Sequence, residues 1–221
     1  MPSNDTPIVD VIASGVHDTK NVLFDALMRI GVAAHEVSGN RGQQALPLLK
    51  DASAAVEQAT TRLSTLLSAY RLARHENPVV LMPVLVGDLV EYAVMRTPSN
   101  SDQQGEIRIV CGDVCSDTWL LDRELVADCL VNALVNALRY AKGQIQISAQ
   151  VEDGWLVLRV EDDGPGFSPE QTTHTARMQS GVGLFVARRI AGLHQQHGRQ
   201  GRLLVSNGGA LGGAVFTLML P

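Results

Sequence analysis

Two asparagines and one aspartate stand at spacings that could bind a nucleotide. Asn132 and Asn136 lie four residues apart in the segment 125–140, whose apolar residues recur at helical spacing, so both amides project from one helical face. Amide oxygens suit Mg²⁺ as hard neutral ligands, and amide NH₂ groups can donate to phosphate. Asp162 follows an alternating strand over 155–160 and opens a glycine-rich turn. Glycines let a nucleotide approach the backbone, and a buried carboxylate can accept a hydrogen bond from an exocyclic amine.

A glycine pair farther along the chain suits a polyphosphate. Gly181 and Gly183 open a predicted helix that runs over 183–193, and a helix start offers free N–H groups and a positive dipole end. Taken alone, the turn after Asp162 is more often a hairpin turn and the glycine pair more often an ordinary helix start. Their occurrence in this order, after the asparagine segment, strongly indicates a nucleotide-binding site.

These three segments resemble the motifs of the ATP-binding domain shared by histidine kinases, gyrases and Hsp90-type chaperones. The resemblance implies ATP and Mg²⁺ as cofactors, with Asn136 as the Mg²⁺ ligand and Asp162 as the acceptor of the adenine amine. It assigns further nucleotide and phosphate contacts to Asn132, Arg139, Tyr140, Gly164, Gly166, Gly181, Gly183 and Leu184.

The residue at position 132 indicates which branch of this superfamily the chain resembles. Relatives that hydrolyse ATP, or that phosphorylate serine on anti-sigma-factor partners, typically carry Glu four residues before the metal-binding asparagine. That carboxylate acts as a general base. Asn132 is an amide without useful basicity. The nucleophile must therefore be active by itself, as a neutral histidine is near pH 7.

His17 is the candidate nucleophile. It stands in Val16-His17-Asp18-Thr19-Lys20-Asn21, which resembles the phosphoacceptor box of histidine kinases. Asp18 could accept a hydrogen bond from one ring nitrogen and fix the tautomer. Asn21 shares the helical face of His17, and in relatives a polar residue there orients the water that dephosphorylates a partner's phospho-aspartate. Four other histidines lack such surroundings, and we interpret them as surface residues without a role in the chemistry: His35, His75, His174 and His194.

Apolar stripes predict two long helices, over about 8–37 and 44–75, joined by a turn. Helices of this length need a further packing partner, because a two-helix hairpin leaves one side of each apolar stripe exposed to solvent. A dimeric four-helix bundle is the economical solution, and packing against the rest of the chain is the alternative. Prolines 78 and 83 mark the boundary, which gives a dimerisation and phosphoacceptor hairpin over 1–77 and an ATP-binding domain over 78–221.

The second half mixes helices and strands without a regular βαβ alternation. We expect an α+β protein in which the helical hairpin precedes an α/β sandwich. The predicted helices cover 85–96, 125–140 and 183–193, and the predicted strands 106–111, 118–121, 144–151, 155–161, 202–207 and 214–220.

Composition excludes some classes. The net charge of −5 over 221 residues argues against nucleic acid as the main partner. No apolar run approaches the about 20 residues of a membrane span, and the N-terminus lacks a secretory apolar region. We therefore expect a cytoplasmic protein whose three cysteines, Cys111, Cys115 and Cys129, are reduced and bind no metal.

The resemblance implies a two-component protein-histidine kinase that autophosphorylates His17 and passes the phosphoryl group to an aspartate of a response-regulator receiver domain. We expect a homodimer through the hairpin, a signal from a separate sensor protein, and possible phosphatase activity toward the regulator. Two alternatives stay open. A histidine phosphotransfer scaffold with an inactive kinase-like domain is supported by Phe185, where the family's last motif usually has a third glycine, and by the short lid over 167–180. The retained motif residues argue against it: Asn136, Asp162, Gly164 and Gly166. An anti-sigma-type serine kinase is disfavoured by Asn132.

Overall fold

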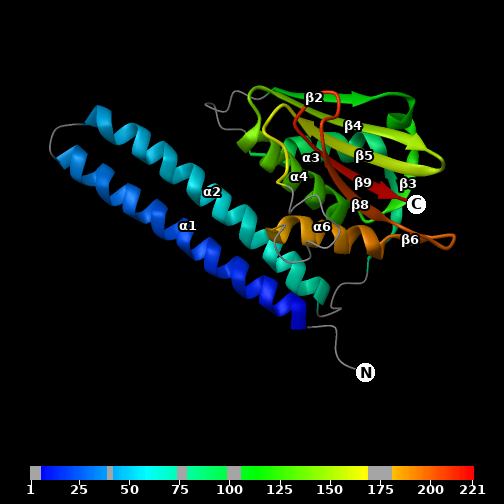
Figure 1. Ribbon diagram of the computed structural model, residues 1–221, viewed down its shortest axis with the longest axis horizontal. Helices are drawn as coiled ribbons and strands as arrows, with labels where there is room; N and C mark the ends of the chain where they lie inside the picture. The colour runs from blue at the N-terminus through cyan, green and yellow to red at the C-terminus, as the bar shows by residue number, and fades with distance from the viewer. Residues whose placement is uncertain (1–5, 39–41, 74–78, 99–105, 169–180) are drawn as a thin grey trace. The chain divides into compact units, whose positions relative to one another are not determined.

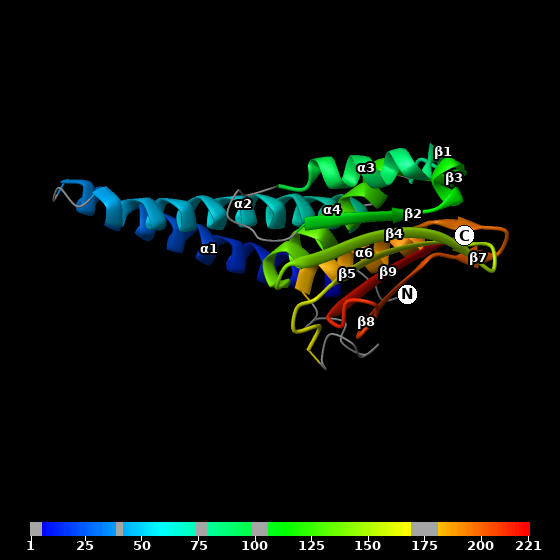
Figure 2. The same cartoon turned by 90° about the horizontal axis from the view of Figure 1, so that it is seen from above.

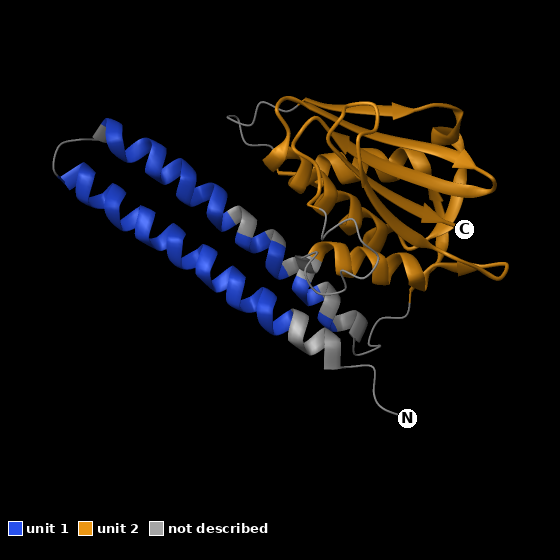
Figure 3. Cartoon of the chain, viewed as in Figure 1, with its two compact units in different colours: residues 1–76 blue, residues 77–221 orange. Residues whose placement is uncertain are grey.

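The chain separates into two compact units, Met1–Glu76 and Asn77–Pro221 (Figure 3). The computed structural model is drawn in Figure 1. It describes residues 6–38, 42–73, 79–98, 106–168 and 181–221.

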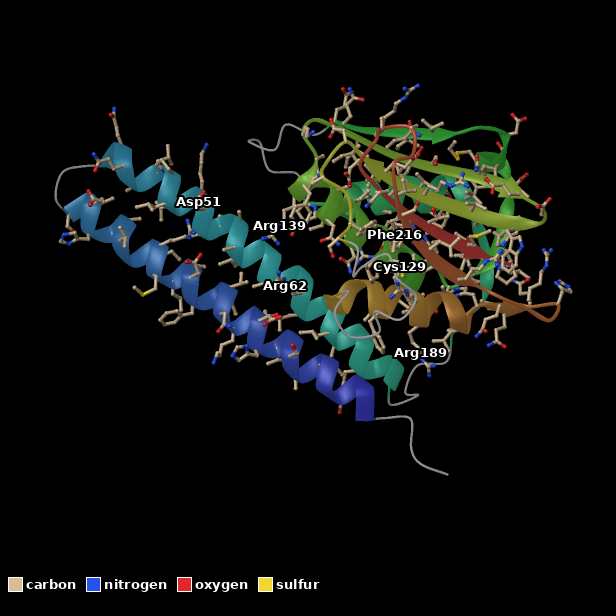
Figure 4. The ribbon with its side chains drawn as sticks, viewed as in Figure 1. Asp51, Arg62, Cys129, Arg139, Arg189 and Phe216 are labelled. Carbon is tan, nitrogen blue, oxygen red and sulfur yellow. A yellow bond between two sulfur atoms is a disulfide. The ribbon has the colours of Figure 1, made fainter. Side chains whose placement is uncertain are left out.

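The first unit is a hairpin of helices α1 (Thr6–Ser38) and α2 (Gly42–Ala73). The predicted helical hairpin is therefore confirmed, with ends within about two residues of those expected. Arg29 of α1 joins the helices through an ion pair of 2.9 Å with Asp51 of α2. Asp51 is labelled in Figure 4. Small side chains at seven-residue spacing line the seam and allow close helix packing; they are Thr19, Ala26 and Ala33 of α1 and Ala45, Ala52 and Ala59 of α2.

A second apolar stripe of the hairpin remains exposed in the single chain. On α2 it follows the heptad positions Leu49, Val56, Leu63 and Tyr70, each between 41% and 46% exposed. On α1 it includes Val16, Leu27, Ile30 and Val37. Stripes of this kind are the usual seam between helices of a bundle. Among the described residues, no helix is both long and apolar enough to cross a membrane.

The second unit is built on a five-stranded mixed sheet of order β2-β4-β5-β9-β8, in which only β2 and β4 pair in parallel. Its strands are β2 (Glu106–Cys111), β4 (Gln144–Glu152), β5 (Trp155–Asp162), β8 (Arg202–Asn207) and β9 (Ala214–Leu220). Helices α3 (Val86–Arg96), α4 (Arg123–Tyr140) and α6 (Gly181–Leu193) cover one face of this sheet (Figure 2). The predicted α+β class is confirmed.

Short elements complete the second unit. β1 (Met82–Leu85) pairs with β3 (Thr118–Leu121), and β6 (Gln195–Gln196) pairs with β7 (Arg199–Gln200). A 3₁₀ turn, η1 (Asp113–Ser116), precedes β3. The sequence predicted β3 but not β1, β6, β7 or η1; segments of two to four residues show too little of a period to be identified consistently.

The core of the second unit lies between the helix layer and the sheet. Leu130 and Leu134 of α4 are fully buried, and so are Leu158 of β5 and Ile190 of α6. Each such side chain contributes about 1.5–3 kcal/mol through burial. Cys129 of α4 and Phe216 of β9 lie in the same interior (Figure 4). Because this face of α4 is buried in the core, only its other face can contact a ligand.

One sequence prediction about the cysteines is wrong. Cys111 and Cys115 form a disulfide, with their Cα atoms 5.6 Å apart. The end of β2 and the following η1 turn bring the two residues to a separation that a disulfide can span. Cys129 is free and buried, and burial raises the pKa of its thiol far above the ordinary range.

Candidate nucleotide site and exposed histidine

Helix α4 presents the two predicted asparagines at the surface of the second unit. The helix starts where Asp122 accepts a hydrogen bond from the N–H of Leu125 (3.1 Å), a standard N-cap. Nδ2 of Asn136 donates to Oδ1 of Asn132 at 3.3 Å. This bond uses the nitrogen of the exposed Asn136 amide, so its oxygen is the atom that could ligate a cation.

Helix α6 begins directly beside Asn132. A Cβ atom added at Gly183 would lie 2.3 Å from Nδ2 of Asn132, so only glycine permits this approach. Residues 181–184 form the first turn of α6, whose N–H groups lack partners within the helix. The side chain of Leu184 is 7% exposed, so only its backbone N–H is suited to a ligand.

The turn after β5 packs against the end of α4. A Cβ at Gly164 would lie 2.5 Å from the carbonyl oxygen of Tyr140, and one at Gly166 would lie 2.6 Å from Oδ1 of Asn207. Gly166 also has a φ of 82°, which disfavours other residues. These glycines therefore bring the ends of α4, β5 and β8 together.

Asp162 is 6% exposed and is held by backbone N–H groups. Its Oδ1 accepts from the N–H of Gly164 (2.8 Å) and of Ala214 (3.2 Å). The N–H of Gly213 donates to the backbone carbonyl oxygen of Asp162 at 2.9 Å. Because both side-chain bonds use Oδ1, Oδ2 is the oxygen suited to accept from a ligand amine.

The residues on either side of Asp162 hold neighbouring segments. Oδ1 of Asp163 accepts from the N–H groups of Lys142 (2.7 Å) and Gly143 (3.2 Å), just after α4. Burial, the largest single influence, raises the pKa of the Asp163 carboxyl, but the backbone donors together outweigh it and the net pKa is lowered. Oε1 of Glu161 accepts from the N–H of Ala210 at 3.0 Å.

Sequence reasoning missed several residues that shape the site. Oδ1 of Asn207 accepts from the N–H of Phe167 (2.7 Å), and its Nδ2 donates to the Phe167 carbonyl (2.9 Å). Glu161 and the loop 208–213 were missed as well. The four glycines within that loop were the available signal. The predicted lid lies almost wholly within 169–180, outside the described residues.

Arg139 and Tyr140 occupy the last turn of α4, and both are exposed. The Arg139 guanidinium lies 5.3 Å from the centre of the Tyr140 ring. The second unit therefore places Gly183 beside Asn132 in the middle of α4, and Asp162 and Gly164 beside the end of α4. The residues present fit a purine nucleotide with Mg²⁺: they provide a buried carboxylate, an exposed amide oxygen and a glycine approach that a Cβ would fill.

The structure places His17, Asp18 and Asn21 on α1, in the first unit. The His17 side chain is 64% exposed, and its Nδ1 lies 3.4 Å from Nδ2 of Asn21. Oδ1 of Asp18 lies 3.6 Å from the same nitrogen, an ion-pair distance rather than a hydrogen bond. Thr19 faces the seam and donates to the carbonyl of Gly15 at 2.7 Å; His17, two residues earlier, lies on the opposite side of the helix.

His194 is a structural residue of the core, whereas the sequence suggested only a surface histidine. It is 1% exposed, its Nδ1 contacts the carbonyl of Ile190 (2.8 Å), and its Nε2 accepts from the N–H of Asp122 (3.0 Å). Burial lowers the pKa of this imidazole. His35 is exposed, whereas His75 and His174 lie outside the described residues.

Comparison of sequences identifies related proteins. The family model "Histidine kinase-, DNA gyrase B-, and HSP90-like ATPase" matches residues 121–221. The sensor protein QseC of Salmonella typhi is 28% identical over 196 residues, which cover 82% of this chain and 42% of QseC. The sensor protein PhoQ of Escherichia coli K12 is 39% identical over 92 residues, or 38% of this chain and 18% of PhoQ. The chain thus spans less than half the length of these curated relatives.

Solved structures share the fold. The Acinetobacter baumannii histidine kinase AdeS superposes with a TM-score of 0.62 at 19% identity, over 90% of this chain and 95% of that one. Full-length ShkA in complex with AMPPNP gives a TM-score of 0.57 at 20% identity, over 96% and 45% of the two chains. The chain is therefore similar in sequence and fold to the cores of sensor histidine kinases, and its residues 121–221 match the model of the histidine kinase, DNA gyrase B and HSP90-like ATPases.

Proposed function

We propose that this chain is an ATP-dependent protein-histidine kinase that autophosphorylates His17 and transfers the phosphoryl group to a response-regulator aspartate. The observation that carries the proposal is the packing of Gly183 against the Asn132 amide. It joins the start of α6 to the asparagine face of α4, where a polyphosphate would meet free N–H groups and amide donors together. The family model that residues 121–221 match supports the same conclusion.

In this proposal each predicted nucleotide residue has a distinct task. Oδ2 of Asp162 accepts a hydrogen bond from the adenine amine. Asn132, Arg139 and the N–H groups at the start of α6 contact the phosphates. Asn136 would hold Mg²⁺ through its amide oxygen, and the bound cation would neutralise phosphate charge. ShkA, which shares the fold, is described in complex with the ATP analogue AMPPNP.

His17 is the proposed phosphoacceptor. Attack by Nε2 requires the tautomer with the proton on Nδ1, the nitrogen that Oδ1 of Asp18 faces at 3.6 Å, with the Asn21 amide turned so that its oxygen faces this N–H. A bond forms between Nε2 and the γ-phosphorus, the bond from that phosphorus to the β–γ bridging oxygen breaks, and ADP leaves. Asn132 stands where a serine kinase or ATPase of this superfamily would carry a basic carboxylate, which favours an acceptor that needs no deprotonation by the protein.

The partners follow from the same proposal. The exposed heptad stripe of the hairpin is the seam of a homodimeric four-helix bundle. The exposed residues beside His17 form the surface on which a response-regulator receiver domain docks. Asn21, one turn after His17, would orient a water in the reverse reaction and give phosphatase activity toward the regulator. A separate sensor or signalling protein supplies the stimulus.

Incubation with γ-labelled ATP and Mg²⁺ tests the kinase activity. We expect acid-labile label on the protein, its loss in His17→Gln, and its retention in His35→Gln, which removes another exposed histidine of the same helix. Absence of label, combined with uptake from a phosphorylated receiver domain, would identify a phosphotransfer scaffold instead. Acid-stable phosphate on a partner without dependence on His17 would identify a serine kinase.

A further inference from the structure

Glu161 is a buried carboxylate that the proposed nucleotide site does not use. It is 8% exposed and directly precedes Asp162 at the end of β5. Successive residues of a strand point to opposite faces, so the two carboxylates project to opposite sides of the sheet. Burial of an acidic side chain is costly unless it is hydrogen-bonded, so its partner indicates what it does.

The partner of Glu161 is the glycine-rich loop between β8 and β9. Oε1 of Glu161 accepts from the N–H of Ala210 at 3.0 Å. A Cβ at Gly209 would lie 2.2 Å from the same oxygen and 2.7 Å from Cγ2 of Val215. The loop backbone is thus wrapped closely around the carboxylate, at a position where only glycine fits.

The far end of the same loop holds Asp162. The N–H of Gly213 donates to the Asp162 carbonyl (2.9 Å), and the N–H of Ala214 donates to Oδ1 of its side chain (3.2 Å). A bond of 2.9 Å from Gly208 N–H to the Gly213 carbonyl closes the loop. Glu161 therefore holds the middle of this loop and Asp162 holds its C-terminal end.

We propose that Glu161 is a positioning residue for adenine recognition: by holding the loop 208–213 through Ala210, it fixes the N–H groups of Gly213 and Ala214, which bond the Asp162 carbonyl and carboxylate respectively. The inference rests on the proposed role of Asp162 as the acceptor of the adenine amine. The loop contains four glycines, which have the largest backbone freedom to lose. Without the Glu161 anchor, the loop samples more conformations and Asp162 is held by fewer donors.

Amide hydrogen exchange in the full chain, measured without nucleotide, tests the positioning step by itself. We expect Glu161→Ala to reduce the protection of Gly213 and Ala214 by about tenfold, the order expected for loss of one buried hydrogen bond. Glu161→Gln keeps an acceptor oxygen and should restore most of the protection. Unchanged protection in Glu161→Ala overturns the proposal, whether or not the protein binds ATP.

Nucleotide binding tests the consequence for recognition. The probes are ATP and purine riboside 5′-triphosphate, which lacks the 6-amino group. Glu161→Ala should raise the Kd for ATP about tenfold and change that for the purine analogue little, because the lost interaction is with the amine. An equal weakening of both nucleotides overturns the inference. Equal wild-type affinity for the two would instead overturn the role of Asp162 within the proposed function, and the exchange result would still decide on Glu161.

A pair of glycine variants separates the contact from backbone strain. Gly209 and Gly212 both have positive φ, 62° and 85°, so alanine is strained at either position. Only Gly209 lies against Glu161; an added Cβ at Gly212 would meet nothing within 4 Å. Gly209→Ala should reproduce the exchange and ATP effects of Glu161→Ala, whereas Gly212→Ala should not. Identical effects of the two glycine variants overturn the proposal.

Discussion

Gly183 lies so close to Asn132 that a side chain at position 183 would begin 2.3 Å from the Asn132 amide nitrogen. The two residues are 51 positions apart and belong to different helices, α6 and α4. The contact sets the start of α6 beside the asparagine face. We therefore expect the proposed phosphate site to be sensitive to a single methyl group at position 183.

Gly183→Ala should weaken nucleotide binding more than it weakens the fold. The added methyl group meets the end of a side chain, so the Asn132 amide can move away while the core stays packed. We expect the Kd for ATP to rise about tenfold and the free energy of unfolding to change by less than about 1 kcal/mol. Isothermal titration and urea unfolding measure the two quantities.

Gly192→Ala is the matched control, because Gly192 also lies in α6 but its nearest neighbour for a new Cβ is Nε2 of Gln200 at 3.4 Å. Gly192 lies in the last turn of α6, so alanine there should change the free energy of unfolding by less than about 1 kcal/mol and leave the Kd unchanged. Wild-type affinity in Gly183→Ala would show that the contact does not shape the site.

The stability of the second unit should decrease as the pH is lowered, because of His194. Burial lowers the pKa of this imidazole, outweighing the Ile190 carbonyl and the Asp122 charge, which raise it. Below its ordinary value of 6.5, the unfolded imidazole takes up a proton that the folded one does not. The unfolded state then binds more protons, so the stability present above pH 6.5 is lost as the pH falls through the folded pKa.

Both tryptophans, Trp119 and Trp155, belong to the second unit, so their fluorescence during urea unfolding reports on the unit that contains His194. His194→Gln should lower the free energy of unfolding at pH 8 by about 1–3 kcal/mol, because the buried Asp122 N–H and Ile190 carbonyl lose their partner. It should also weaken the dependence of stability on pH between pH 7 and 5. His35→Gln should leave both unchanged. Parallel pH profiles for wild type and His194→Gln would refute this assignment.

Reduction of the Cys111–Cys115 disulfide should destabilise the second unit modestly. The bond closes a loop over a sequence separation of only 4. The chain-entropy relation gives about 2 kcal/mol for so short a loop. Urea unfolding with and without dithiothreitol measures the difference, and the double variant Cys111→Ser, Cys115→Ser should not respond to reductant. Titration of three free thiols in the unfolded, unreduced protein would contradict the disulfide.

A charge in the exposed stripe of the hairpin should break the proposed homodimer. Leu63 is 46% exposed in the single chain and would lie in the dimer seam. Leu63→Glu places two carboxylates in that seam and should raise the dimer dissociation constant by at least about 100-fold. Light scattering after gel filtration measures the mass. Ala54→Glu, at an exposed position outside the stripe, should remain dimeric. An unchanged mass for Leu63→Glu would argue for a different seam.

Periodicity along the chain determined the main elements. The spacing of apolar residues identifies α1, α2 and α4, because burial of one face repeats every 3.6 residues whatever the helix packs against. Alternation identifies β5 and β9 in the same way. Motif composition likewise led to Asp162, Asn136 and the glycines, since their chemistry is readable from residue type and local spacing.

Only the tertiary structure showed which distant residues support these motifs. Glu161 meets Ala210 across 49 positions, and Asn207 meets Phe167 across 40. The Cys111–Cys115 disulfide depends on where β2 ends and η1 turns. Such contacts arise from strand register and loop closure, which no local period encodes, and a hydrogen bond forms only when the whole unit brings donor and acceptor within about 3 Å.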